Sequence, residues 1–192
     1  MTIHVTRAAE GLDRRAFTIA DMERMVEVGI LAPDERVELI GGELVPMSAK
    51  GSRHEAIKAA LNYRWGRACP DGFLFVPETG LRLDAQTYVE PDFVVVSRTK
   101  RLAEVTGPDV LLAVEVADSS LDFDLHRKPR VYAAFGVREL WVIDARRRLV
   151  HRHDRVTPNG YSQVDLVDAA THLMPRHAPE AFALSLDSLE DV

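Results

Sequence analysis

The first part of the chain alternates between helical and strand-like patterns of apolar residues. Apolar residues at helical spacing follow Thr18, a suitable N-cap, and Gly29 ends that predicted helix. The segment VELIGGELVPM places two short apolar stretches around Gly41-Gly42, which indicates a hairpin with a two-residue turn. Helical spacing returns over residues 51–66, and the next segment, FLFVPETGLRL, predicts two strands separated by a proline.

The centre of the chain is more apolar and predicts buried strands. PDFVVV and DVLLAVEV are continuous runs rich in β-branched residues, typical of strands covered on both faces. Residues 122–135 show helical spacing, and Pro129 within them should lie in a first helical turn or at a kink. LWVID predicts another buried strand. An outer hairpin is predicted from LVHRHDRV and GYSQVDLV. The order of elements predicts an α/β fold with a central mixed sheet flanked by helices.

Length and composition fit an ordinary globular protein. The 192 residues are 46% hydrophobic and 28% charged, which suits one domain. Residues 1–16 are polar without a period, so we expect a flexible N-terminal arm followed by a single domain over residues 17–192. The one cysteine, Cys69, excludes an internal disulfide and a zinc site built of several cysteines. No apolar run reaches the ~18 residues of a membrane span, and no signal peptide is visible, so a cytoplasmic protein is expected.

Charge and common cofactor motifs give little direct guidance. The net charge of −6 argues against a broad cationic face for nucleic acid. Residues 120–155 nevertheless carry nine bases and five acids, either as an ordinary solvated surface or as a basic rim beside an anionic substrate. The absence of G-x-G-x-x-G, G-x-x-x-x-G-K-[ST], H-E-x-x-H and G-x-S-x-G weakens dehydrogenase, P-loop NTPase, zincin and α/β-hydrolase interpretations.

Two carboxylates occupy positions where apolar residues would be expected. Asp92 opens PDFVVV, and Glu115 lies inside LLAVEV, flanked on its own strand face by small alanines. Burial of a carboxylate is costly unless it is paired or binds a metal. If the two strands are neighbours, both acids could bind one Mg²⁺ or Mn²⁺. The alternative is a structural ion pair. Lys128, at the start of the following helix, could reach these carboxylates or could be an ordinary solvated lysine.

At this point the chain resembles a known family. The ordered series ERVELIGGEL, GSRHEAI, EPDFVVV, LLAVEVADSS and KPRVYAAFGVRELWVID is similar to the Uma2 family of endonucleases, within the PD-(D/E)XK, or restriction-endonuclease-like, superfamily. The resemblance covers roughly residues 18–155. It implies a restriction-endonuclease-like core and a Mg²⁺- or Mn²⁺-dependent endonuclease that hydrolyses phosphodiester bonds. It also implies nucleic acid, with DNA the first choice, as the partner, and a homodimer.

Carried over residue by residue, the resemblance assigns the metal site. Asp92 and Glu115 become the metal-binding acids, and Val116 the residue that offers its backbone carbonyl to the metal. The superfamily signature has a lysine two residues after the second acid, where this chain has Ala117. Uma2-like chains resemble this one in lacking that lysine, and Lys128 on the following helix is the candidate replacement.

Further assignments and an alternative stay open. The resemblance matches Glu38 and His54 to the family's hairpin glutamate and helix-start histidine, either of which could complete the catalytic site or be an ordinary surface residue. His151 and His153, together with Asp154, could bind a transition metal, although the polar solvent face of an outer hairpin is the more common explanation for such a pattern. Basic residues near Lys128 could contact phosphates; these are Arg127, Arg130 and Arg146–Arg148. Because Ala117 breaks the signature, the second hypothesis is a catalytically silent module that binds nucleic acid or protein.

Overall fold

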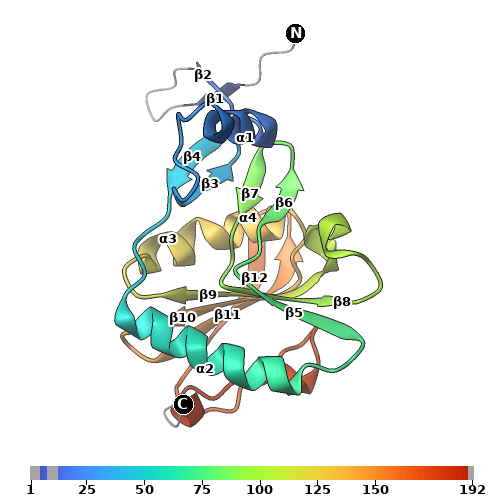
Figure 1. The fold of residues 1–192 in the computed structure, drawn as a ribbon. Coiled ribbons are helices and arrows are strands. Elements are labelled where there is room, and N and C mark those ends of the chain that lie inside the picture. Colours follow the sequence, from blue (N-terminus) through green and yellow to red (C-terminus); the bar gives the residue numbers. More distant parts are fainter. Residues whose placement is uncertain (1–4, 8–12, 190–192) are drawn as a thin grey trace. The chain divides into compact units, whose positions relative to one another are not determined.

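The computed structural model describes residues 5–7 and 13–189, which fall into two compact units (Figure 1). Residues 1–48 with 80–90 form one unit, and residues 49–79 with 91–192 form the other. Of the predicted N-terminal arm, residues 1–4 and 8–12 lie outside the described residues, and β1 (Val5–Arg7) pairs with β2 (Asp13–Arg15). The division into a flexible arm and a single domain stays a prediction.

The first unit contains a helix and a four-stranded antiparallel sheet of order β4-β3-β7-β6. Its elements are α1 (Ile19–Glu27), β3 (Val37–Ile40), β4 (Glu43–Pro46), β6 (Leu81–Asp84) and β7 (Thr87–Val89). The predicted cap is confirmed, because the Thr18 hydroxyl accepts the Asp21 N–H at 3.1 Å. The predicted hairpin is confirmed as well: Gly41 and Gly42 form its turn with φ of +59° and +83°, which a non-glycine residue rarely adopts.

The second unit is built around a six-stranded mixed sheet of order β12-β11-β10-β9-β8-β5, in which only β9 and β10 are parallel. Its strands are β5 (Phe73–Pro77), β8 (Phe93–Ser97), β9 (Val110–Ala117), β10 (Leu140–Asp144), β11 (Leu149–Thr157) and β12 (Gly160–Val167). Figure 1 shows α2 (Ser52–Ala68) on one face, and α3 (Leu121–His126) and α4 (Lys128–Ala134) on the other. None of the described helices is long and apolar enough to cross a bilayer.

The core of this unit lies between α2 and the sheet. Trp65 is fully buried there and makes ring contacts at centroid distances of 5.8–6.2 Å with four other aromatic residues: Phe75, Phe93, Trp141 and Phe182. Phe182 comes from the C-terminal segment, whose short 3₁₀ turns η3 (Glu180–Phe182) and η4 (Asp187–Leu189) pack onto this core. Two further 3₁₀ turns, η1 (Leu102–Glu104) and η2 (Gly107–Asp109), connect β8 to β9.

The helical segment that follows β9 is divided at the predicted proline. Residues 122–135 were expected to be helical, and they form α3 and α4 with Arg127 between the two helices. Pro129 lies in the first turn of α4, where the missing N–H costs no helical hydrogen bond. The break starts a new helix at Lys128, which places this residue on the first turn over the sheet.

Candidate functional site

Strand pairing positions Asp92 and Glu115 together. Strands β8 and β9 are antiparallel neighbours, and Phe93 is paired with Val114. Asp92 directly precedes Phe93 and Glu115 directly follows Val114, so the two acids take the next facing positions. They are only 6% and 5% exposed, and a carboxylate this buried must be compensated by nearby groups. The expectation that the two acids belong to neighbouring strands is confirmed.

The Asp92 carboxylate is compensated by a histidine and a backbone amide. His54 Nε2, on the first turn of α2, lies 3.1 Å from Asp92 Oδ2, and the Val116 N–H donates to the same oxygen at 2.8 Å. Burial alone would raise the pKa of Asp92. The hydrogen bond and charge of His54, the Val116 amide and the charge of Lys58 outweigh burial and hold this pKa below its usual value. Asp92 is therefore ionised at neutral pH.

The Glu115 carboxylate is compensated from the opposite side by α4. Lys128 Nζ lies 3.1 Å from Glu115 Oε1, and the Tyr132 hydroxyl donates to the same oxygen at 2.5 Å. Lys128 is 3% exposed and Tyr132 is fully buried. The two residues are four apart in α4, so both point towards β9. The hypothesis of a solvated Lys128 is wrong, because the side chain is buried against Glu115.

The predicted site residues of the second unit thus make two adjacent contacts. One contact joins Asp92 to His54 and Val116, and the other joins Glu115 to Lys128. The two contacts are adjacent because Glu115 and Val116 share a peptide bond. Glu38 belongs to the other compact unit, where its carboxylate accepts the Glu90 N–H at 2.8 Å. A role for Glu38 in the site stays a prediction.

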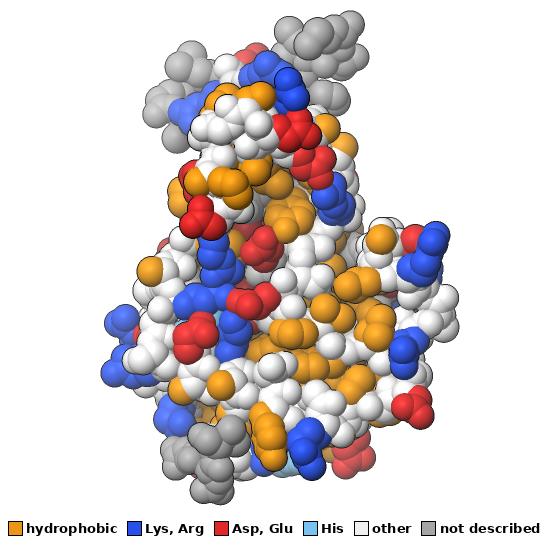
Figure 2. All heavy atoms as spheres, in the orientation of Figure 1, with side chains coloured by type: hydrophobic (Ala, Val, Ile, Leu, Met, Phe, Trp, Pro, Cys, Tyr) orange, Lys and Arg blue, Asp and Glu red, His pale blue; other side chains and the backbone are white. Residues whose placement is uncertain are grey.

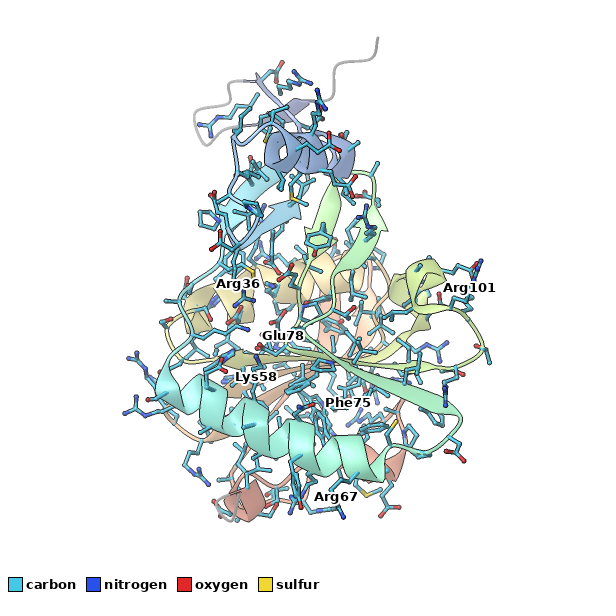
Figure 3. The ribbon with its side chains drawn as sticks, viewed as in Figure 1. Arg36, Lys58, Arg67, Phe75, Glu78 and Arg101 are labelled. Carbon is cyan, nitrogen blue, oxygen red and sulfur yellow. The ribbon has the colours of Figure 1, made fainter. Side chains whose placement is uncertain are left out.

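Three charged residues beside Asp92 were not predicted from the sequence. Lys58 Nζ lies 2.6 Å from Glu78 Oε1, and Lys50 Nζ contacts the same oxygen. Figure 3 shows Lys58 on α2 and Glu78 after the end of β5 lying next to each other. Glu78 is tied to the site, because its N–H donates to the Asp92 carbonyl at 2.9 Å. The only sequence signal was that Lys58 follows His54 by four residues on a predicted helix.

The described residues contain no group of three or more His, Cys, Asp or Glu side chains arranged for a metal ion. His151 and His153 accordingly do not form one with their neighbours, and burial followed by the charge of His151 lowers the pKa of His153 to about 4. Two carboxylates are nevertheless a common protein contribution to Mg²⁺ binding, because this ion keeps several waters. The donor set of Asp92 and Glu115 therefore fits Mg²⁺ or Mn²⁺.

Three of the arginines predicted to contact phosphates also have partners within the protein, and for Arg147 the partner is Asp144, with Nη1 3.8 Å from Oδ2. Arg146 Nε donates to Asp118 Oδ1 at 2.8 Å. Arg148 donates to the Leu186 carbonyl at 3.0 Å and so holds the C-terminal segment against the sheet. Arg148 thus has a structural contact, which the sequence did not indicate.

Comparisons with known proteins bear on fold and family. The chain is similar to the crystal structure of a "putative nuclease belonging to DUF820" from Anabaena variabilis, with a TM-score of 0.62 and 12% identity over 85% of this chain and 94% of that one. A second similarity, to the type IIG restriction endonuclease BpuSI, has a TM-score of 0.40 and 16% identity over 76% of this chain and 17% of that one. No curated protein sequence matches the chain.

The first of these likenesses confirms the predicted fold. The mixed sheet with helices on both faces is that of the restriction-endonuclease-like nucleases. The model of the Uma2 family, described as "Putative restriction endonuclease", matches residues 19–187. Since this match spans nearly the whole sequence, the protein belongs to the Uma2 family.

Proposed function

We propose that the protein is a divalent-metal-dependent endonuclease that hydrolyses phosphodiester bonds in nucleic acid, with Asp92 and Glu115 as its metal ligands. The observation that carries the proposal is the pair of buried acids at facing positions, one directly before β8 and one within β9, each with its own basic partner. Burying two carboxylates is unfavourable in the absence of a bound cation or an internal partner. A protein that needs only an apolar core would gain nothing from these two acids. Family membership supports nucleic acid as the substrate.

In this proposal each side chain has a distinct task. Asp92 and Glu115 hold the cation, with the Val116 carbonyl as a further oxygen donor. When bound, Mg²⁺ or Mn²⁺ supplies Lewis-acid polarisation of a phosphoryl oxygen. Lys128 places a positive charge beside the negative charge that develops on the phosphate in the transition state.

Two residues act by positioning others. His54 fixes the Asp92 carboxylate through its 3.1 Å contact, and Tyr132 fixes Glu115 through its 2.5 Å hydrogen bond. The fully buried Tyr132 also sets the direction of the α4 turn that carries Lys128. Glu38 is kept as a candidate catalytic residue on the strength of the family resemblance. DNA as the preferred substrate, a homodimer and a cytoplasmic location also stay predictions.

Mn²⁺ titration and a cleavage assay test the proposal together. Isothermal titration should show Mn²⁺ binding to the wild-type protein and its loss in Asp92→Asn and Glu115→Gln. Asp109→Asn is the matched control, because Asp109 is a partly exposed carboxylate held by Lys100. Supercoiled plasmid, single-stranded DNA and RNA are then incubated with Mn²⁺ or with EDTA. Wild-type Mn²⁺ affinity equal to that of Asp92→Asn would contradict the proposal.

The second candidate is a catalytically silent binding module. Ala117 in place of the signature lysine favours it, as does the fact that both acids already have internal partners. The same assays separate the two candidates, because a silent module cleaves none of the three substrates in Mn²⁺ even where it folds and binds an oligonucleotide.

A further inference from the structure

The use of lysine in this chain is unusual. Of 24 basic residues only four are lysines, and the other twenty are arginines. Three of these lysines have side chains that are at most one-fifth exposed: 19% for Lys50, 11% for Lys58 and 4% for Lys128. The fourth, Lys100, is 46% exposed. Lysine is therefore placed where a compact ammonium group, with three donors, is enclosed by the protein.

Lys50 and Lys58 converge on a single anionic oxygen. Both Nζ atoms contact Oε1 of Glu78, and the Lys58 distance is 2.6 Å. Lysine binds phosphate as a point charge with three donors, so two ammonium groups that converge on one oxygen also suit a phosphate oxygen. The Glu78 side chain is 46% exposed, so solvent and ligands can reach this position. In the space-filling view, acidic and basic side chains are intermingled on this face of the molecule (Figure 2).

Glu78 is held in a backbone conformation that its residue type disfavours. Its φ is +47°, in the left-handed region that residues other than glycine adopt rarely and at a cost in energy. The hydrogen bond from its N–H to the Asp92 carbonyl, at 2.9 Å, fixes this conformation. The strained backbone directs the carboxylate to the two lysines, which places an anion beside Asp92 at an energetic cost to the chain.

The position of this cluster relates it to the proposed metal site. Lys58 lies one helical turn beyond His54, the partner of Asp92, and both side chains are on the sheet-facing side of α2. Glu55 lies 3.8 Å from Lys58 Nζ and contacts His54 Nδ1 at 3.0 Å, so it completes the charged surroundings. Since the Glu78 N–H also donates to the Asp92 carbonyl, the lysine cluster adjoins the position that the proposed function gives to the scissile phosphate.

We propose that Lys50 and Lys58 bind a backbone phosphate of the nucleic-acid substrate and that the Glu78 carboxylate occupies this site in the free protein. The inference rests on the proposed nuclease function and adds to it a second substrate contact. A phosphodiester carries one negative charge, as the carboxylate does, so the exchange leaves the charge around the two lysines unchanged. Glu78 is more than one-third exposed and can turn to solvent when the phosphate arrives.

Fluorescence anisotropy with a labelled single-stranded DNA and its duplex, in EDTA, tests this assignment independently of the metal site. Lys58→Met should weaken binding about tenfold and should reduce the slope of log K against log salt by about one. Glu78→Gln should tighten binding several-fold, because the competing anion is removed. Lys100→Met removes a lysine from a more exposed ion pair with Asp109 and should stay within twofold of the wild type.

The outcomes are distinguishable from those of the proposed function. Unchanged affinity and salt slope in Lys58→Met and Glu78→Gln would overturn the phosphate site, even if wild-type protein cleaves DNA in Mn²⁺. If Lys58→Met does not fold, as judged by circular dichroism, Glu78→Gln decides alone, and failure to tighten binding overturns the inference. Wild-type protein that binds inorganic phosphate but no oligonucleotide also overturns it. Loss of Mn²⁺ binding in Asp92→Asn tests only the metal site.

Discussion

Replacing Lys128 by methionine separates its electrostatic role from its packing. Methionine keeps the length of the buried stem and removes the charge that lies 3.1 Å from Glu115 Oε1. The Tyr132 hydroxyl stays as the donor to that oxygen. The variant therefore leaves a carboxylate that is 5% exposed without its cation.

The expected loss of stability follows from two limits. Two unit charges 3.1 Å apart interact by about 5 kcal/mol at an effective dielectric constant of ~20. The carboxylate can instead take up a proton, which costs about 4 kcal/mol at pH 7 for a glutamic acid with a reference pKa of ~4.3. Protonation is the smaller of these two costs, so it limits the loss. The free energy of unfolding of Lys128→Met should therefore be about 3–4 kcal/mol below that of the wild type at pH 7. At pH 5 protonation costs only about 1 kcal/mol, so the loss should shrink accordingly.

Urea denaturation of a double-mutant cycle measures this contact. Lys128→Met, Glu115→Gln and the double variant are compared with the wild type at pH 7 and pH 5. Each single variant leaves one buried charge and the double variant leaves none, so we expect a coupling energy of at least ~1.5 kcal/mol at pH 7. Lys100→Met, in a more exposed pair, should lose less than ~1 kcal/mol.

Activity gives a second measurement on the same variant. If Lys128 stabilises the transition state, Lys128→Met should cleave ~10²-fold more slowly in Mn²⁺, while its Mn²⁺ affinity changes little because lysine is not a ligand. Single variants whose losses add to within ~0.5 kcal/mol would refute the buried ion pair. Wild-type cleavage rates in Lys128→Met would refute the catalytic assignment.

Three further predictions concern the second unit as a whole. His153 has a buried Nε2 with no hydrogen-bond partner among the described residues, and its pKa is lowered to about 4. The stability of the wild type should therefore fall by up to ~3 kcal/mol as pH drops from ~6.5 to ~4. Urea titrations of His153→Leu should show a flatter dependence of stability on pH. Trp65→Ala removes the centre of the aromatic core and should cost ~3–5 kcal/mol by thermal denaturation; wild-type melting would contradict this. A Cβ on Gly107 would lie 1.9 Å from the Phe135 carbonyl oxygen, so Gly107→Ala should destabilise by ~1–3 kcal/mol, whereas Gly66→Ala, in open space on α2, should be neutral or stabilising.

Features that depend on a few neighbouring residues were predictable from the sequence. The Gly41-Gly42 turn follows from the positive φ that glycine adopts readily. Pro129 had to lie in a first helical turn or at a kink because of its missing N–H, and it lies in the first turn of α4. The neighbouring positions of Asp92 and Glu115 were predictable because Asp92 opens, and Glu115 lies inside, a run that is apolar enough to be a central strand.

Features that depend on contacts between distant residues were not predictable. Lys58 and Glu78 are twenty residues apart, and nothing in either local sequence indicates that they meet. In the C-terminal segment, likewise, the apolar residues have no regular spacing, because the segment reaches the core through 3₁₀ turns and through the bridge between Leu173 and Leu184. In both cases the side chains are fixed by packing of the whole sheet and not by local propensity.

Ala117 illustrates how one departure from a signature can be compensated by the fold. It is fully buried at the end of β9, and strand alternation places it on the same face as Glu115. On that face Lys128 and Tyr132 of α4 already approach the Glu115 carboxylate, so a lysine at position 117 would bring a second cation to the same oxygen. A small residue at 117 and a lysine at 128 therefore act together, because they provide the Glu115 carboxylate with one cation. Because the cation is carried by the first residue of α4, and Tyr132 holds this helix against β9, the position of the cation depends on the packing of α4 against the sheet.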